Sequence, residues 1–411
     1  MRTHFIAIGG AAMHNLALAL HEKGYQVTGS DDAIFEPSKS RLDKKGLLPQ
    51  EMGWFPEKIT ADIEAVILGM HAKADNPELL RAQALGLKIY SYPEFLYEQS
   101  KNKTRVVIGG SHGKTTITSM ILHVMHYHNI EVDYMVGAQL EGFDTMVHLT
   151  EENDFIVLEG DEYLSSPIDR RPKFLHYHPH VALISGIAWD HINVYPQFEE
   201  YVHQFELLAQ DVPKSGSLIY DETDSLVNTV GQKEYADIQK YAYKAHPAVV
   251  RNGKTFLILP NKKELAIEVF GEHNLKNLNG ARLVLSQIGI EDEQFYEAIA
   301  SFKGAAKRLE LVGQNDETVF YRDFAHAPSK VEATTKALKG QYPNRHLVAC
   351  LELHTFSSLN KNFLKEYAHK LDGADTAVVY FSPKTLEHKK MPALSVEEVK
   401  ANFANSNLEV F

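Results

Sequence analysis

Residues 106–118 read Val-Val-Ile-Gly-Gly-Ser-His-Gly-Lys-Thr-Thr-Ile-Thr, and this segment restricts the fold more than any other part of the chain. An apolar strand enters a glycine-rich turn, and a helix expected over residues 117–127 leaves it. This order is typical of a phosphate-binding loop, in which a lysine contacts the β/γ oxygens and the next hydroxyl holds Mg²⁺. Lys114 and Thr115 occupy those two positions. The segment therefore predicts an α/β domain that binds a nucleoside triphosphate.

The match to the general loop pattern is incomplete. When Gly113, Lys114 and Thr115 are aligned with the pattern, its first glycine falls on Ile108, so the loop is a shortened variant. The alternative is a plain strand-to-helix turn that happens to contain Lys-Thr. The strand, glycines, lysine, hydroxyls and helix follow in the expected order, which favours the phosphate loop.

Length and composition limit the class of protein. A chain of 411 residues is too long for one ordinary core and predicts two or three domains. The net charge of −12 argues against a nucleic-acid-binding surface, whereas a small anionic ligand needs only a local positive pocket. The single cysteine, Cys350, excludes an intrachain disulfide and fits a cytoplasmic location. We expect neither a signal peptide nor a membrane span, since no apolar run approaches about 18 residues.

Strands and helices alternate along the chain in three groups. Expected strands lie at 5–8, 25–29, 65–68, 88–90, 106–109, 155–159, 181–185, 318–321, 346–351 and 376–381, and expected helices at 11–23, 77–85, 117–127, 330–338 and 359–370. A polar linker at 99–104 and a change of composition at 302–309 separate the groups. We therefore expect domains at 1–100, 101–303 and 304–411, the first with a Rossmann-like parallel sheet.

Small residues lie where the first strand meets the first helix. They are Gly9, Gly10, Ala11, Ala12 and Met13, with Ser30 and Asp31 at the end of the second strand. The three-glycine spacing of a dinucleotide fingerprint is absent, so the turn alone is a weak signal. Small residues still let a diphosphate approach the helix N-terminus, and the acidic residue stands where a ribose or base would be read. A plain packing turn is the alternative.

Acidic side chains follow two buried strands of the middle group. Glu159, Asp161 and Glu162 come at the end of one strand, and Asp190 and His191 follow another. α/β sheets bind ligands at the carboxyl ends of their strands, and a carboxylate there can complete a Mg²⁺ shell. Solvated surface charge is the alternative for each residue.

Histidines are dense at 123–128 and 176–180. Their spacing matches no closed zinc site and no cysteine accompanies them, so we do not expect a zinc centre from the spacing.

Six motifs together resemble one family. They are Gly110-Ser-His-Gly-Lys-Thr-Thr, Glu159-Gly-Asp-Glu, Trp189-Asp-His, Gly271-Glu-His-Asn-Leu-Lys-Asn, Lys307-Arg308 and Asp323-Phe-Ala-His-Ala-Pro. In this order and spacing they resemble the Mur ligases, ATP-dependent amide-forming enzymes of peptidoglycan synthesis, over almost the whole chain. The Gly-Gly-x-x-Met turn and residues 75–78 are similar to the branch that acts on UDP-N-acetylmuramate. Within it, residues 169–177 look more like the murein peptide ligases than the UDP-N-acetylmuramate–L-alanine ligases.

The resemblance implies three α/β domains, namely a Rossmann-like N-terminal domain, a central phosphate-loop domain and a C-terminal α/β domain. ATP would be bound by Gly110, Ser111, His112, Gly113, Lys114, Thr115, Thr116, Asn274, Asn277, Arg308 and Asp323. The UDP-sugar would be bound by Gly9, Gly10, Ala11, Ala12, Met13, Ser30 and Asp31. Mg²⁺ would be held by Thr115, Glu159 and His191, and the catalytic residues would be Lys114, His191 and Arg308.

The amine that receives the activated carboxylate is expected to be a murein tripeptide, with free L-alanine as the alternative. Arg170, Arg171 and Lys173 place three cations after the Glu159 strand, and arginine binds carboxylates bidentately. His326 would join them from the third domain. A solvated loop is the other explanation of these cations, and the segment 354–357 resembles the alanine-adding enzymes.

The chain also departs from the family pattern. The usual Asn-x-Glu before Asp-His is replaced by Gly186, Ile187 and Ala188, and the second histidine of the third-domain motif is Ala327. The position of a carbamoylated lysine in the later ligases falls near Phe205, so no carbamate is expected. Family members usually extend a few dozen residues beyond Phe411, so a shortened third domain is one expectation.

Amide formation in water is uphill, so the resemblance implies that ATP first converts the muramoyl carboxylate to an acyl phosphate, which the amine then attacks. Two other interpretations stay open. A ligase similar to folylpolyglutamate synthase would lack a domain like the first hundred residues, and a nucleotide-binding module without turnover would explain Ala188 and Ala327.

Overall fold

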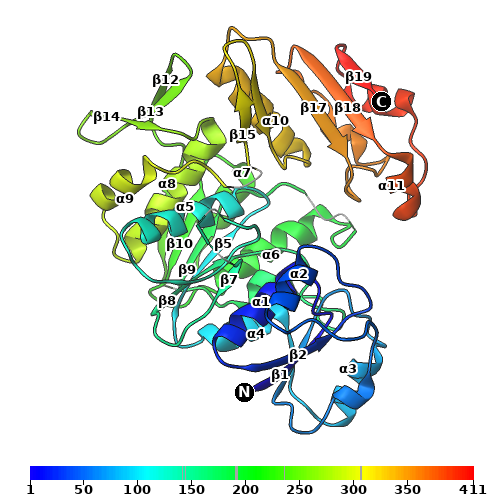
Figure 1. Ribbon diagram of the computed structural model, residues 1–411. Helices are drawn as coiled ribbons and strands as arrows, with labels where there is room; N and C mark the ends of the chain where they lie inside the picture. Colours follow the sequence, from blue (N-terminus) through cyan, green and yellow to red (C-terminus); the bar gives the residue numbers. More distant parts are fainter. Residues whose placement is uncertain (141, 144, 190–192, 236, 306–307) are drawn as a thin grey trace.

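The computed structural model describes residues 1–140, 142–143, 145–189, 193–235, 237–305 and 308–411 (Figure 1). These residues form three α/β regions that follow one another in chain order, with the middle region between the other two (Figure 1). No helix in the described part of the chain is long and apolar enough to cross a lipid bilayer. The fold is therefore the three-part α/β arrangement that the sequence predicts.

The first region is a four-stranded parallel sheet. Its order is β2-β1-β3-β4, from β1 (Arg2–Ile6), β2 (Gln26–Ser30), β3 (Ala65–Leu68) and β4 (Ile89–Ser91). The helices are α1 (Ala11–Glu22), α2 (Ser38–Lys44), α3 (Pro77–Ala84) and α4 (Tyr92–Ser100). Asn76 caps α3 through its side chain, and Ser91 and Glu94 form a capping box on α4. All six elements predicted here are present, although β1 lies closer to the N-terminus than expected.

The middle region is built on a seven-stranded sheet whose central strand is β5 (Thr104–Gly109). The order is β11-β10-β9-β5-β8-β6-β7, from β6 (Asp133–Met135), β7 (Val147–His148), β8 (Phe155–Glu159), β9 (Val181–Ile184), β10 (Ser217–Asp221) and β11 (Gln239–Tyr243). Only the β6–β7 pair is antiparallel among these neighbours. The carboxyl ends of β5, β8 and β9 therefore lie side by side at one edge of the sheet.

Helices cover both faces of this sheet. They are α5 (Lys114–Tyr127), α6 (Phe198–Gln210), α7 (Ser225–Gln232), α8 (Glu272–Gln287) and α9 (Asp292–Ile299). Along β5, Val106 and Ile108 belong to the core that includes residues of α5, α8 and α9, whereas Val107 belongs to the core that includes residues of α6. Alternate side chains of a strand point to opposite faces, so a fully buried parallel strand is apolar throughout.

Helix α5 begins at Lys114, three residues before the predicted start at 117. Gly113 stands directly before it with φ +80°, a left-handed conformation that glycine adopts without steric cost. The glycine therefore turns the chain straight from the loop into the helix, and Lys114 and Thr115 lie in its first turn.

A small antiparallel sheet follows the seven-stranded sheet in the chain. It comprises β12 (Ala248–Arg251), β13 (Lys254–Ile258) and β14 (Glu264–Ile267), in that order. The sequence pattern predicts no element there. Only alternate residues of β13 are buried, so the apolar signal of each strand is short.

The third region holds a hairpin and a parallel sheet. The hairpin is β15 (Glu310–Gln314) with β16 (Val319–Arg322), and the sheet is β17 (Val348–Leu353), β18 (Thr376–Phe381) and β19 (Leu408–Val410). The helices are α10 (Pro328–Gln341), α11 (Pro383–His388) and α12 (Val396–Phe403). Cys350 on β17 is exposed.

The helix predicted at 359–370 is wrong. The segment contains only a 3₁₀ turn, η3 (Leu364–Tyr367). Its apolar residues are buried as a helical pattern would suggest, but the Asn360 side chain accepts from the Asn362 N–H, and Thr355 and Ser358 form a similar local bond. Such side chains compete with the backbone bonds of a helix, which explains the turns.

Arg105 joins the first region to the middle region. Its Nε donates to the carbonyls of Tyr177 and His178 at 2.8 and 2.9 Å, and its Nη1 donates to three carbonyls at the end of α4 and the turn after it. Those three belong to Ser100, Lys101 and Lys103, at 3.0, 3.0 and 3.1 Å. The side chain is buried, and its bonds to the carbonyls of Tyr177, Ser100 and Lys103 are buried too, so the guanidinium satisfies three carbonyl groups that water reaches poorly.

We predict that Arg105→Leu lowers the free energy of unfolding by about 3 kcal/mol or more, because several buried carbonyls lose charge-assisted bonds. Urea unfolding followed by circular dichroism measures the change. Arg251→Leu is the matched control, since Arg251 is 55% exposed and pairs on the surface with Glu264. Equal, small effects of the two substitutions would contradict the role of Arg105.

Candidate active site

The phosphate loop meets two acidic residues at the carboxyl edge of the middle sheet. Thr115 Oγ1 donates to Glu159 Oε1 at 2.9 Å, and the Gly137 N–H donates to Glu159 Oε2 at 2.7 Å. Burial raises the pKa of Glu159, although the Gly137 N–H and the Lys114 charge act in the opposite direction. A hydroxyl and a buried carboxylate side by side are oxygen ligands of the kind that Mg²⁺ takes. Thr115 and Glu159 therefore fit a magnesium ion, while Asp190 and His191 lie outside the described residues.

Lys114 is held by the loop and by an acidic partner. Its Nζ donates to Glu162 Oε2 at 2.7 Å and to the Gly110 carbonyl at 2.5 Å. Burial alone would lower the pKa of Lys114, but the carboxylates of Glu162 and Asp161 outweigh it and raise that pKa. The lysine is therefore charged, and its ammonium group already faces the interior of the loop.

Tyr201 on α6 connects this ion pair to the side chain of Ser111 in the loop. Its hydroxyl lies 2.7 Å from Ser111 Oγ and donates to Glu162 Oε1 at 3.1 Å. Ser111 Oγ in turn accepts from the Ala188 N–H at 2.8 Å. Tyr201 was not expected from the sequence, because its only signal was its place on the apolar face of a helix, where most tyrosines are core residues.

Gly186 makes room for the His112 ring. A Cβ added at position 186 would lie 2.2 Å from His112 Cε1 and Nε2, a distance that no side chain can take. Burial lowers the pKa of His112 to about 3, and the charges of Lys330, Lys114 and Lys276 contribute. The ring is therefore neutral at physiological pH and lies within a strongly positive environment.

A cavity of about 740 Å³ opens between the middle and third regions. It is lined by the loop residues Ser111, His112, Gly113, Lys114, Thr115 and Thr116, by Glu159, Glu162, His273, Asn274, Lys276 and Asn277, and by Arg308, Asp323, His326, Lys330 and Lys336. Five of the lining residues are lysines or arginines, and five carboxylates, those of Glu159, Glu162, Glu272, Asp323 and Glu332, also line the cavity. The positive charge that suits a polyphosphate anion is therefore local, at the Lys114 ammonium group beside the glycine loop.

Helix α8 presents two asparagines to this cavity. Asn277 Oδ1 would lie 2.5 Å from a Cβ on Gly113, so the helix packs directly on the loop. Asn274 Nδ2 donates to the Phe270 carbonyl at 3.0 Å, and Asn277 Nδ2 lies 3.5 Å from Asn274 Oδ1. Both residues are buried beside the loop, on the side where we expected the nucleotide.

The third region contributes three of the predicted residues to the same cavity. Arg308 lies over the Phe324 ring at 5.1 Å from its centroid, and Thr334 donates to the Asp323 carboxylate. His326 Nδ1 lies 3.0 Å from the Phe324 carbonyl. These groups come from the start of the region and the segment before α10, so they face the loop across the cavity. Lys307 lies outside the described residues.

A second cavity, of about 190 Å³, lies beside the first one. Ser111 and Lys330 line both, and Ala188, Trp189, Ala327 and Phe363 also line the smaller one. Ala188 and Ala327 are two of the positions where the chain departs from the family pattern. The two departures therefore meet in space, although they lie far apart in the sequence and belong to different regions of the fold.

The predicted UDP-sugar residues form a separate cluster. None of them lines either cavity. Ala11 and Ala12 are exposed at the start of α1, whereas Met13, Ser30 and Asp31 are buried. Asp31 Oδ2 accepts from the Gly9 N–H at 2.7 Å, and burial raises the pKa of this carboxyl. Asp31 thus organises the turn itself, a role that the sequence pattern does not indicate.

The cations at 170–173, which were expected to bind a peptide, mostly pair with carboxylates of the chain itself. Arg171 Nη2 lies 2.6 Å from Asp169 Oδ2, and Lys173 pairs with Asp161. Arg170 is exposed and takes part in none of the ion pairs between described residues. None of the three lines the two cavities. Two of the three charges are therefore neutralised by neighbouring carboxylates, which the order of residues did not reveal.

Comparison with known proteins places the chain in a family. A three-part α/β fold with a phosphate loop at the edge of a large cavity is typical of an enzyme class that uses a nucleoside triphosphate. "Mur ligase family, catalytic domain" matches residues 2–104, "Mur ligase middle domain" matches 108–285 and "Mur ligase, glutamate ligase domain" matches 307–410. The chain belongs to the Mur ligase family, whose members are ATP-dependent amide-forming ligases.

Two curated relatives illustrate the two candidate activities. The UDP-N-acetylmuramate–L-alanine ligase of Clostridium kluyveri is 30% identical over 92% of this chain and 82% of its own length. The UDP-N-acetylmuramate–L-alanyl-γ-D-glutamyl-meso-2,6-diaminoheptanedioate ligase of Escherichia coli is 28% identical over 86% of this chain and 79% of its own.

Solved structures agree on the fold. The murein peptide ligase of Psychrobacter arcticus has a TM-score of 0.71 at 23% identity, covering 100% of this chain and 90% of that one. The UDP-N-acetylmuramate–alanine ligase of Thermotoga maritima also has a TM-score of 0.71, at 21% identity, covering 100% and 91%. Fold similarity therefore does not separate the two activities.

We predict that Lys114→Ala lowers the rate of ATP-dependent ligation by about 10²–10³, because a charge that faces the transferred phosphate is lost. UDP-sugar binding should change little, since the predicted UDP-sugar residues lie in a separate cluster. Phosphate release measures the first effect and calorimetry the second. Lys101→Ala on the surface serves as the control. Near-normal turnover of the variant would show that the loop is not the ATP site.

We predict that Gly186→Ala weakens ATP binding by about 10-fold or more, because the new methyl group forces the His112 ring out of its place against the loop. Fluorescence titration with a labelled ATP analogue measures the affinity. Gly289→Ala controls for a general effect on stability, since a methyl group added there meets no neighbouring atom, although the positive φ of this residue will cost some stability by itself. Unchanged affinity in Gly186→Ala would contradict this explanation of the glycine.

Proposed function

We propose that this Mur ligase joins the lactyl carboxylate of UDP-N-acetylmuramate to the amino group of a murein peptide that begins with L-alanine, with ATP as the energy source. The observation that carries the ligase chemistry is the shared cavity, where Lys114, Thr115 and Glu159 of the middle region face Arg308 and Asp323 of the third. The family membership supplies the reaction class, and the two substrates are the proposal.

The residues around the loop support an order of events in which the negative charge of the ATP phosphates is neutralised before the phosphoryl group is transferred. Lys114 gives up Glu162 Oε2 for the terminal phosphates of ATP, and Tyr201 keeps Glu162 in place during that exchange. A bound Mg²⁺, held by Thr115 and Glu159, would withdraw charge from the transferred group. Arg308 approaches the same phosphate from the third region, so two anions can meet.

The two covalent steps need no reactant besides ATP, the muramoyl carboxylate and the amine. The carboxylate oxygen attacks the γ-phosphorus, the bond to ADP breaks, and an acyl phosphate forms. The amine then attacks the acyl carbon, loses a proton to solvent or to a neighbouring base, and expels inorganic phosphate. The products are the amide, ADP and phosphate.

The peptide is proposed as the amine because of the second cavity. Alanines stand at 188 and 327, where the family pattern has polar side chains, and both line a space of about 190 Å³ beside the phosphate loop. A longer amine needs room next to the reacting carboxylate, and these small side chains provide it. Arg170 remains available for a peptide carboxylate, while the paired Arg171 and Lys173 lend less support than their sequence suggested.

Free L-alanine is the second candidate. Most of the curated relatives that resemble this chain are named as UDP-N-acetylmuramate–L-alanine ligases, and residues 354–357 resemble them too. His354 lies near His326, with ring centroids 5.9 Å apart, so that segment approaches the cavity.

We predict a kcat/KM at least about 10-fold higher for the murein tripeptide than for L-alanine, in a phosphate-release assay with ATP and UDP-N-acetylmuramate. A preference for L-alanine would overturn the peptide assignment and leave the ligase assignment intact. ATP binding without phosphate release under any amine would instead support the nucleotide-binding module.

The variant Ala327→His tests the cavity argument directly. The imidazole should fill part of the smaller cavity and lower kcat/KM for the tripeptide by about 10-fold, with a smaller effect on L-alanine. Thr385→His, on α11 away from the residues that line either cavity, is the matched control. Equal losses for both amines would contradict a peptide subsite at Ala327.

A further inference from the structure

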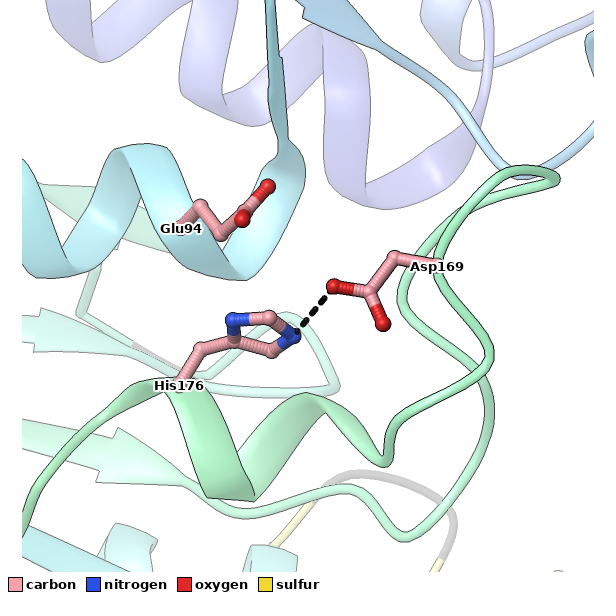
Figure 2. A group of neighbouring side chains, drawn as sticks. All are labelled: Glu94, Asp169 and His176. Carbon is pink, nitrogen blue, oxygen red and sulfur yellow. Dashed lines mark ion pairs between the residues drawn. The ribbon is translucent and has the colours of Figure 1, made fainter.

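Three side chains that suit a metal ion meet between the first and middle regions. Glu94 lies in the first turn of α4, Asp169 lies in the loop after β8, and His176 ends η2 (Lys173–His176). One ligand atom from each residue lies within 4.8 Å of the other two, and the side chains point toward a common space (Figure 2). They are separated widely in the sequence, so only the fold reveals the group.

His176 gives the group a second feature that points to a ligand. The imidazole is 4% exposed, and its Nε2 is buried without a hydrogen-bond partner. Nε2 faces Asp169 Oδ2 at 3.4 Å, which is close enough for attraction but does not form a hydrogen bond (Figure 2). Burial, followed by the charge of Arg171, lowers the pKa of His176. A neutral imidazole nitrogen without a partner can coordinate a metal.

Local backbone bonds position both carboxylates. Glu94 Oε2 accepts from the Ser91 N–H at 2.7 Å within the capping box, which holds the side chain at the start of α4. Asp169 Oδ1 accepts from the Arg171 N–H at 3.0 Å. The Asp169 backbone is fixed by bonds of its N–H and carbonyl to Ser166, at 3.0 and 3.1 Å. A backbone N–H group thus helps to hold each carboxylate in place.

A cation already occupies part of the space between the carboxylates. Arg171 donates to Asp169 through Nε and Nη2, at 3.1 and 2.6 Å, and its Nη2 lies 3.7 Å from Glu94 Oε1. Two carboxylates and one guanidinium leave one net negative charge. The Arg171 side chain is 59% exposed, so it can turn into water when another cation takes its place.

We propose that Glu94, Asp169 and His176 form a binding site for a divalent transition-metal ion such as Zn²⁺, and that the Arg171 guanidinium takes the place of the ion in its absence. One imidazole and two carboxylates are ligands that Zn²⁺ accepts, whereas Mg²⁺ and Ca²⁺ prefer all-oxygen sites. The ion would tie α4 of the first region to the middle region. This site is distinct from Thr115 and Glu159 and does not depend on the proposed ligase activity.

The test is calorimetric titration of the whole protein with Zn²⁺ in the absence of nucleotide, with millimolar Mg²⁺ present to occupy oxygen-ligand sites. The expected result is one Zn²⁺ per chain, and Co²⁺ should give visible absorption bands with the same stoichiometry. His176→Gln and Asp169→Asn should each weaken binding by about 100-fold, since loss of a direct ligand exceeds the effect of its supporting residues. Glu98→Gln, on the same helix and paired with Lys101, should have no effect.

The variant Arg171→Gln gives the sharpest outcome. If the guanidinium competes with the metal, its removal should tighten Zn²⁺ binding by about 10-fold. A purely structural salt bridge predicts no such gain. Thermal unfolding without metal shows whether each variant folds, and Glu94→Gln, whose amide oxygen can still cap α4, replaces any variant that does not. Zn²⁺ binding that is unchanged in His176→Gln and in Glu94→Gln, or no binding to the wild type, would overturn the proposal.

Discussion

The buried ion pair between Lys114 and Glu162 is the interaction on which the phosphate loop depends. A buried ammonium group is costly unless a partner compensates its lost hydration, and Glu162 provides that partner at 2.7 Å. Glu162 is itself fixed by Tyr201, and Tyr201 by Ser111, so the acid, the helix α6 and the loop support one another. In the proposed reaction a triphosphate would take the place of the Glu162 carboxylate on Lys114, so the ammonium group would keep a negatively charged partner throughout.

Much of this arrangement could be predicted from the sequence, because it follows from short local patterns. The loop at 106–118, the acidic strand end at Glu159 and the parallel strands each carry a period and composition that specify them. The helix predicted at 359–370 is absent, because local side-chain bonds such as that of Asn360 outweigh the helical spacing of the apolar residues. Tyr201 and the antiparallel sheet carried no distinctive pattern, so only the tertiary structure reveals them.

Charge pairing was the least predictable property. Arg171 and Lys173 looked available in the sequence, yet Asp169 and Asp161 neutralise them. In the sequence, the spacing of the histidines at 176–180 argues against a zinc site made from those histidines alone. The metal-binding group uses one of those histidines with Glu94 and Asp169, and neither partner could be recognised before the chain folded.

Arg105 has a consequence for motion. Arg105, Tyr177 and His178 all belong to the middle region, so the bonds that would have to break for the first region to rotate against it are those to the carbonyls of Ser100, Lys101 and Lys103. The first and middle regions should therefore move together as one rigid body. The large cavity, by contrast, lies between the middle and third regions. A movement between these two regions would therefore open or close it. We therefore expect that any closure of the large cavity moves the third region, while the first and middle regions keep their relative position.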